Sequence, residues 1–140
     1  MPEVIRDTQA MLARMKPTLG PEEFVFCTTR DGEIIARASS IALGLFKEDE
    51  GTTLIVARAD ATALGFDDAQ PMRRIVLEVF SSLDGIGLTA GVAAALTAAN
   101  IPCNMVAAFH HDHVFVPSAL AERAQAVLIE LAARGHGTEN

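Results

Sequence analysis

The second half of the chain carries a succession of secondary-structure patterns that limits the fold more than any other feature. Residues 75–80 have the β-branched and aromatic composition of a strand, and the apolar residues of 88–99 recur at helical spacing. Residues 103–109 and 113–116 predict two short strands joined by a tight turn, and residues 120–131 predict a second helix. The order β-α-β-β-α is typical of a ferredoxin-like α+β fold, an antiparallel sheet with helices on one face.

The first half has a similar but reduced order. Residues 24–29 predict a strand, and the pair Asp31-Gly32 predicts a turn in place of the first helix. A hairpin is expected over residues 41–57, and a short alanine-rich helix over residues 60–64. We interpret the two halves as a degenerate duplication.

Pro71 marks the predicted boundary between an N-terminal domain, residues 1–70, and a C-terminal domain, residues 71–140. The two hairpins correspond loosely, because each has a strand that ends in a phenylalanine, Phe46 or Phe109, followed by a polar turn and another strand. The residues after the last helix are too polar and glycine-rich to give the second sheet a fourth strand.

Composition narrows the class of protein. The chain has 140 residues, half of them hydrophobic, and a net charge of -7. It can bury a core, and it has no basic surface for nucleic acid. We expect no membrane partner, since no apolar run reaches the roughly 18 residues of a spanning helix. Cys27 and Cys103 are not spaced as a metal or redox motif, so we expect reduced core thiols in a cytoplasmic protein.

Three segments resemble a known family. These are EEFVFCT, which begins at Glu22, FKEDEGTTLIV, which begins at Phe46, and the residues GLTA, CNMVA and HDHVFV between Gly87 and Val116. Together they resemble small stand-alone proteins made of two tandem ACT-like domains. The resemblance implies βαββαβ modules that hold an amino acid between two such units and regulate a protein. It also implies sheets that share strands, with the N-terminal repeat completing the other sheet. We predict a homodimer, because the missing last strand of the second repeat would leave an open sheet edge and ACT-like domains commonly pair.

The loop before the helix at Leu88 is the candidate ligand site. A glycine-bearing loop that opens a helix presents backbone N–H groups to a carboxylate. Asp84 and nearby hydroxyls could receive an α-ammonium group. The family's acid-x-Pro-Gly-Leu loop is here DGIGL, without the proline and one residue longer, and the first repeat shows no such loop. The predicted ligand-binding residues are Ser81, Ser82, Asp84, Gly85, Gly87, Leu88, Thr89 and, by the resemblance, Asn104.

Structural roles compete with these assignments. Asp84 or a serine could simply cap the helix, and Asn104 could be a polar residue at a strand edge. His110 and His113 would form an opposed pair if His111 and Asp112 were the central residues of the turn. We expect no metal site there, because a third and a fourth ligand are missing.

The acidic run Glu48 to Glu50 predicts a solvated turn, and Arg73 and Arg74 are expected to be surface charges. No sequence motif of a catalytic site is present, and Cys103 beside a histidine fits a core thiol better than a nucleophile.

The sequence therefore predicts a non-catalytic regulatory module. Its partners would be an amino acid, a second copy of the chain and a regulated protein, and it would need no cofactor. Two alternatives remain open. One is an assembly or scaffold protein with a vestigial cleft, and the other is a small metal-dependent enzyme that uses the hairpin with His110 and His113.

Overall fold

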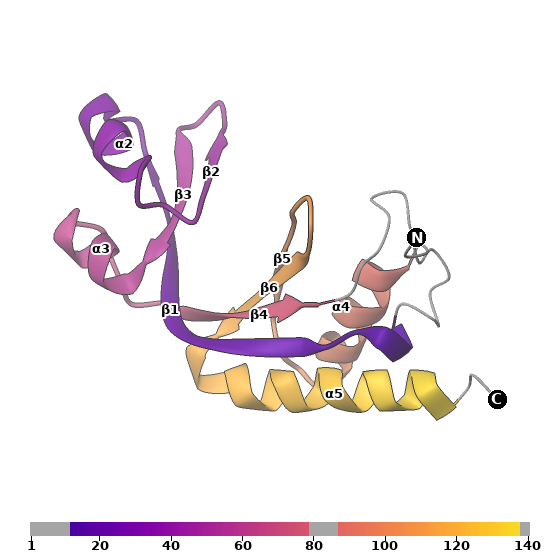
Figure 1. Ribbon diagram of the computed structural model, residues 1–140. Coiled ribbons are helices and arrows are strands. Elements are labelled where there is room, and N and C mark those ends of the chain that lie inside the picture. The colour runs from indigo at the N-terminus through magenta and orange to yellow at the C-terminus, as the bar shows by residue number, and fades with distance from the viewer. Residues whose placement is uncertain (1–11, 79–86, 138–140) are drawn as a thin grey trace. The chain divides into compact units, whose positions relative to one another are not determined.

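The computed structural model describes residues 12–78 and 87–137, and these fall into two units. Residues 22–72 form the N-terminal unit, and residues 12–21 together with 73–137 form the C-terminal unit. Strand β1 (Pro17–Thr29) begins in the C-terminal unit and ends in the N-terminal unit (Figure 1). In the part of the chain that is described, no helix has the length and apolar character needed to cross a bilayer.

The N-terminal unit is a small sheet with a helical layer. After β1 it contains α2 (Gly32–Ala38), β2 (Gly44–Lys47), β3 (Thr52–Ala57) and α3 (Arg58–Ala63). The strand order is β2-β3-β1, and both pairings are antiparallel. Because side chains alternate across a strand, one face of β1 and β3 turns toward the helices. The core on that face consists of Val25, Ala38, Leu54, Val56 and Ala61.

Helix α2 corrects the prediction of a turn at Asp31. Asp31 is the N-cap of this helix, and its carboxylate accepts a hydrogen bond from the Glu33 N–H at 2.9 Å. The sequence was ambiguous because Asp-Gly is also typical of hairpin turns. The helix is short, and Ala38 is the residue that it buries, so its apolar stripe is too brief to show a helical period. Both halves therefore have the order β-α-β-β-α.

The C-terminal unit contains longer helices. Its elements are β4 (Met72–Leu77), α4 (Leu88–Ala98), β5 (Asn104–Ala107), β6 (Asp112–Pro117), a 3-10 turn (Ser118–Leu120) and α5 (Ala121–Gly137). The strand order is β1-β4-β6-β5. The Glu78 N–H donates to the Lys16 carbonyl at 3.1 Å, next to the start of β1. The expectation that the N-terminal repeat completes this sheet is confirmed.

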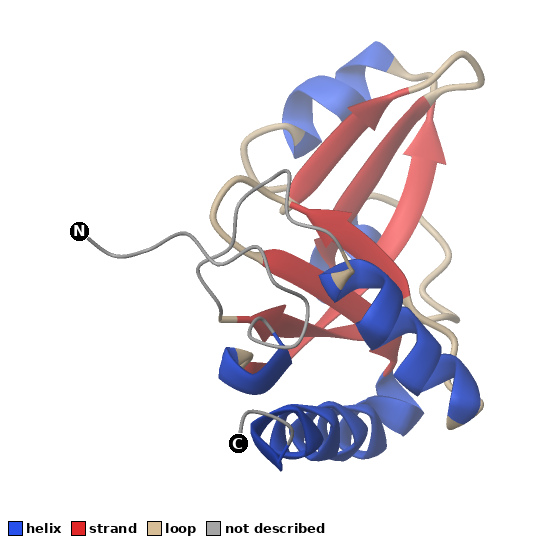
Figure 2. Cartoon of the chain, turned by 90° about the vertical axis from the view of Figure 1, so that its right-hand side faces the viewer, coloured by secondary structure: helices blue, strands red, loops and turns tan. Residues whose placement is uncertain are grey.

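Burial of apolar side chains stabilises the packing of the helices of this unit against its strands. Helices α4 and α5 contact each other on one face of the sheet (Figure 2). Fully buried side chains come from every layer, namely Ile75, Leu77, Val92, Leu96, Val114, Val116 and Leu128. Each such side chain contributes about 1.5–3 kcal/mol relative to an exposed one. The division into domains 1–70 and 71–140 remains a prediction, and in the structure residues 12–21 belong with residues 73–137.

The two hairpins have the same register. In the first, Gly44 pairs with Ile55, and in the second Asn104 pairs with Phe115. Counting along each ladder makes Phe46 equivalent to Val106. The predicted correspondence of Phe46 with Phe109 is therefore wrong, because the second hairpin's first strand ends at Ala107 and Phe109 lies in the loop. The duplication is closer than the sequence suggested.

Helix α2 provides a test of the N-terminal unit. Asp31→Ala removes the side-chain acceptor at its first turn, so we expect a loss of about 1 kcal/mol in the free energy of unfolding. Urea unfolding followed by circular dichroism measures this loss. Asp31→Asn keeps an acceptor and should stay within a few tenths of a kcal/mol of the unmodified protein. An equal loss in both variants would mean that the cap does not stabilise α2.

Candidate functional site

The structure describes only the end of the predicted ligand loop. Gly87 is the N-cap of α4, with φ 100° in the left-handed region and no side-chain capping bond. The Gly91 N–H donates to the Gly87 carbonyl at 2.8 Å, so the helix begins here. The alternative in which Asp84 or a serine is the N-cap is therefore wrong. The predicted ligand residues Ser81, Ser82, Asp84 and Gly85 lie outside the described residues.

A glycine at this N-cap has two physical consequences. Only glycine adopts a positive φ without a steric penalty, and it leaves no Cβ beside the first turn. The first N–H groups of a helix have no partner within it, and they carry the positive end of its dipole. An anionic group could therefore approach the N–H groups of Leu88 and Thr89 without a side chain of residue 87 in the way.

The other predicted residues differ in what they can offer. Leu88 is 5% exposed and belongs to the hydrophobic core, so it can present only its backbone to a ligand. Thr89 is exposed on the first turn of α4. Asn104 is exposed at the first position of β5, opposite Phe115. Its register places it on the sheet face that does not carry α4 and α5, since the next residue, Met105, packs against the core.

The start of β6 collects half-buried ionisable groups. Burial raises the pKa of Asp112, against the opposing effect of the His113 and His111 charges. Burial also lowers the pKa of His113, and the Arg74 charge lowers it further. The Arg74 Nη1 lies 3.5 Å from the His113 Nδ1. Both shifts favour the neutral form of the side chain in the folded protein.

The predicted pairing of His110 with His113 is wrong. Val106 is the residue opposite His113, and the Ala108 N–H donates to the His111 carbonyl at 3.1 Å to close the loop. Asp112 is therefore the first residue of β6 and not a turn residue. Within the described residues, no group of three His, Cys, Asp or Glu side chains is placed to hold a metal ion.

The acidic hairpin loop and the two arginines at the start of β4 differ in their exposure to solvent. The acidic residues from Glu48 to Glu50 are exposed in the hairpin loop, as predicted. Arg73 and Arg74, predicted as surface charges, are only partly exposed. The Arg73 Nε donates to the Gly20 carbonyl at 3.0 Å, which ties the start of β4 to β1.

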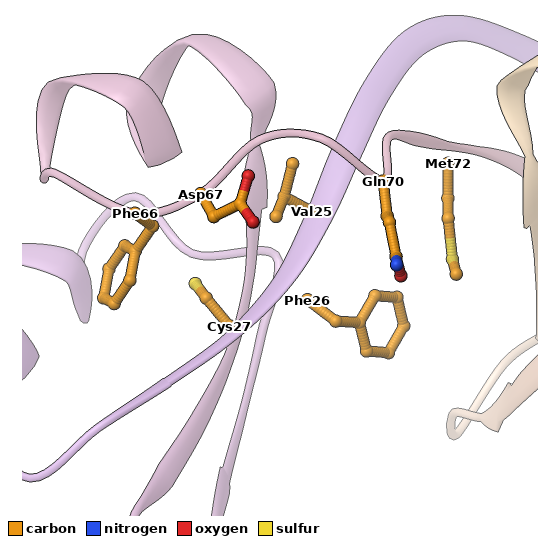
Figure 3. Close-up of a pocket in the computed structure, with 7 residues that line it drawn as sticks. All are labelled: Val25, Phe26, Cys27, Phe66, Asp67, Gln70 and Met72. Atoms are coloured by element: carbon orange, nitrogen blue, oxygen red, sulfur yellow. The ribbon is translucent and has the colours of Figure 1, made fainter.

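A cavity in the N-terminal unit was missed by the sequence analysis. It has a volume of about 350 Å³ and lies between β1 and the segment that follows α3 (Figure 3). No sequence motif indicates it, because the two sides of the cavity come from separate parts of the chain. The residues that line it are Val25, Phe26, Cys27, Phe66, Asp67, Gln70 and Met72.

The cysteines behave as structural thiols. Cys27 and Cys103 are both free and half-buried. Burial raises the pKa of each thiol, which keeps it protonated and a poor nucleophile at neutral pH. The Cys27 Sγ donates to the Leu54 carbonyl at 3.6 Å. The interpretation of both residues as reduced thiols packed against the cores is confirmed.

Two ACT-domain family models match the chain, one over residues 4–73 and the other over residues 72–130. Among solved structures, the chain is similar to a protein of unknown function from Vibrio cholerae, described as a "possible transport protein". The two share 32% identity with a TM-score of 0.79, over 89% of this chain and 94% of that chain. No curated protein has detectable sequence similarity to the chain.

More distant structures share the fold. The regulatory subunit of aspartate kinase from Thermus flavus aligns with a TM-score of 0.56 and 10% identity, over 82% of this chain and 95% of that chain. Aspartate kinase from Clostridium acetobutylicum, described as an allosteric enzyme, aligns with a TM-score of 0.64 and 8% identity, over 86% of this chain and 34% of that chain. These likenesses show the ferredoxin-like α+β fold alone, and that predicted fold class is confirmed.

The environment of His113 predicts a pH dependence of stability. Because its pKa is lowered in the folded protein, the unfolded chain binds more protons in the window below the ordinary value of 6.5. Stability should therefore fall as pH drops through this window, and His113→Gln should reduce the fall. Urea midpoints at about pH 7.5 and pH 5.5 measure the difference.

The exposed His110 in the same hairpin is the matched control. We expect His110→Gln to keep the pH dependence of the unmodified protein, because the ring lies in the solvent-exposed loop. Asp112 has the opposite effect on stability. Because its pKa is raised in the folded protein, the free energy of unfolding falls as pH rises above the ordinary value of 3.8. Equal pH dependence in His113→Gln and the unmodified protein would contradict the assignment.

Proposed function

The chain belongs to the ACT-domain family, and from that premise we propose that it binds a free amino acid and regulates a partner protein without catalysing a reaction itself. ACT domains are regulatory modules that bind small molecules and often oligomerise. The observation that carries the proposal is the tandem arrangement, in which one ACT-domain match falls on each half of the chain. The regulatory subunit among the structures of the same fold supports it.

The proposed site is the loop from Ser81 to Thr89, with Asn104 beside it. A free amino acid carries an α-carboxylate and an α-ammonium group. The glycine N-cap of α4 leaves the helix N-terminus accessible to the carboxylate. Asp84 has the charge that the ammonium group requires. Ser81, Ser82 and Thr89 would provide hydroxyl groups for the remaining polar atoms of the ligand.

The alternative function is assembly alone, in which the sheets join subunits and the loop binds nothing. The two functions differ in one property. A ligand that binds only the folded protein must raise its stability as the ligand concentration rises, whereas a scaffold with a vestigial cleft is stabilised by no amino acid.

We propose the cytoplasm as the location, because free amino acids are available there and the half-buried thiols of Cys27 and Cys103 are unpaired.

A thermal-shift screen of the common amino acids tests the function. We expect at least one to raise the melting temperature, and calorimetric titration then gives its affinity. Asp84→Ala should weaken this binding by about ten- to a hundredfold, the effect of losing a charge-assisted hydrogen bond. Asp49→Ala, at an exposed position in the hairpin loop, is the matched control and should keep the affinity. Stabilisation by no amino acid would favour the assembly function.

The exposed edge strands support a homodimer. The first part of β1 fills the place of the missing fourth strand, so the open edges are those of β2 and β5. Apolar side chains are exposed there, with Phe46 at 71% and Val106 at 37%. Unprotected apolar edges associate with other strands. The predicted open edge after the last helix is therefore not the contact that we propose for the dimer.

Light scattering measures the oligomeric state directly. We expect a species of twice the 14.8 kDa chain mass, and Phe46→Glu should shift it toward the monomer. Ile129→Glu is the control, because Ile129 is a 52% exposed apolar residue on α5 and not on a strand edge. A monomer at high micromolar concentration would refute the dimer, and equal effects of both substitutions would refute the edge contact.

A further inference from the structure

We propose that the cavity of the N-terminal unit is a second ligand site, which binds a small primary amine with an apolar body and no carboxylate. The cavity lies wholly within residues 22–72, whereas the proposed amino-acid loop belongs to the other half of the chain. The proposed amine site is therefore separate from the proposed amino-acid site, and this proposal does not rest on amino-acid binding.

The cavity lies where a loop segment, and not a strand, flanks β1. In the strand order β2-β3-β1-β4-β6-β5, the neighbour of β1 on this side is β4, which begins only at Met72, after the segment that follows α3. The chain leaves α3 through Gly65, which has a φ of 85°, and the Phe66 N–H bonds to the Ala61 carbonyl at 2.9 Å. The segment then passes β1 without forming a ladder, and space remains between them.

Most of the side chains that line the cavity are apolar, while polar atoms form the larger share of its exposed surface. The wall from β1 is formed by Val25, Phe26 and Cys27, and the other wall includes Phe66 and Met72 (Figure 3). Register places Val25 and Cys27 on one face of the strand and Phe26 on the other, so the cavity opens across the strand edge. A volume of about 350 Å³ is at the small end of the range for ligand sites. The walls therefore suit a compact apolar body such as a phenyl ring.

The polar groups of the cavity select a cation. Asp67 and Gln70 project from the connecting segment toward β1 (Figure 3), and none of the lining residues is basic. One oxygen of Asp67, the Oδ1, accepts from the Ala69 N–H at 2.9 Å, which holds the carboxylate in place. The second oxygen remains to accept from a ligand.

The cation that bonds to this segment, Arg58, does so through Asp68 and not through Asp67. The Arg58 Nη1 lies 3.1 Å from the Glu23 Oε1, and its Nε lies 3.4 Å from the Asp68 Oδ2. Thr62 donates to the same oxygen of Asp68 at 3.1 Å. Asp67 is solvent-exposed and forms no ion pair within the described residues, so its carboxylate brings a negative charge to the cavity. A protonated amine would be attracted by this charge and a carboxylate repelled, which separates the ligand class from free amino acids.

Calorimetric titration with phenethylamine tests the proposal, with hydrocinnamate as an anionic probe of similar size. We expect phenethylamine to bind saturably with a dissociation constant of about 1 mM, in keeping with the few atoms it can bury. Hydrocinnamate should not bind. Asp67→Asn keeps the acceptor for Ala69 but removes the charge, so it should weaken phenethylamine binding about three- to tenfold. Asp49→Asn should leave the binding unchanged.

Reaction of Cys27 with dithiodipyridine locates the bound probe. In a Cys103→Ala background, phenethylamine should slow this reaction at the concentrations that saturate the calorimetric signal, because Cys27 lines the cavity. Equal binding of both probes, unchanged affinity in Asp67→Asn, absence of saturable binding or an unprotected Cys27 would each overturn the proposal. None of these outcomes bears on amino-acid binding, which is tested separately through Asp84.

Discussion

The pairing of β1 with strands of both units is the constraint on which the rest of the structure depends. Its residues from Phe24 to Thr29 pair with β3, and its first residues lie beside β4, where Arg73 donates to the Gly20 carbonyl. Pro21, which has no N–H to donate, stands where the strand passes from one unit to the other. The C-terminal sheet obtains in this way the strand that its own half of the sequence lacks.

This use of β1 has a consequence for the other unit. The strand that completes the C-terminal sheet comes from the start of the chain, whereas the segment after α3 continues toward β4 and does not return as a strand beside β1. A loop segment therefore flanks the later part of β1, and a cavity of about 350 Å³ lies there. The same strand thus pairs with β4 at its start and borders a cavity farther along.

The two repeats have also become chemically different at equivalent places. Helix α2 begins at Asp31, whose carboxylate satisfies a backbone N–H of its own first turn. Helix α4 begins at Gly87, which offers no side chain to its first turn. A helix start whose N–H groups are already satisfied has less to offer an anion than one capped by glycine. The two helix starts therefore differ in what they could offer an anion, and the proposed amino-acid loop lies at the one that glycine caps.

The sequence by itself determined the elements whose signal is local. The strand over residues 52–57, the helix that begins at Leu88 and the β-α-β-β-α order of the second half follow from periodicity and glycine positions, and the ACT resemblance follows from three short segments. Only the tertiary structure decided that Asp31 caps a helix, that His113 faces Val106 and Arg74, and that β1 lies between β3 and β4. The physical reason is that registers and cavities depend on backbone bonds and burial between segments distant in sequence, and local patterns carry no record of those partners.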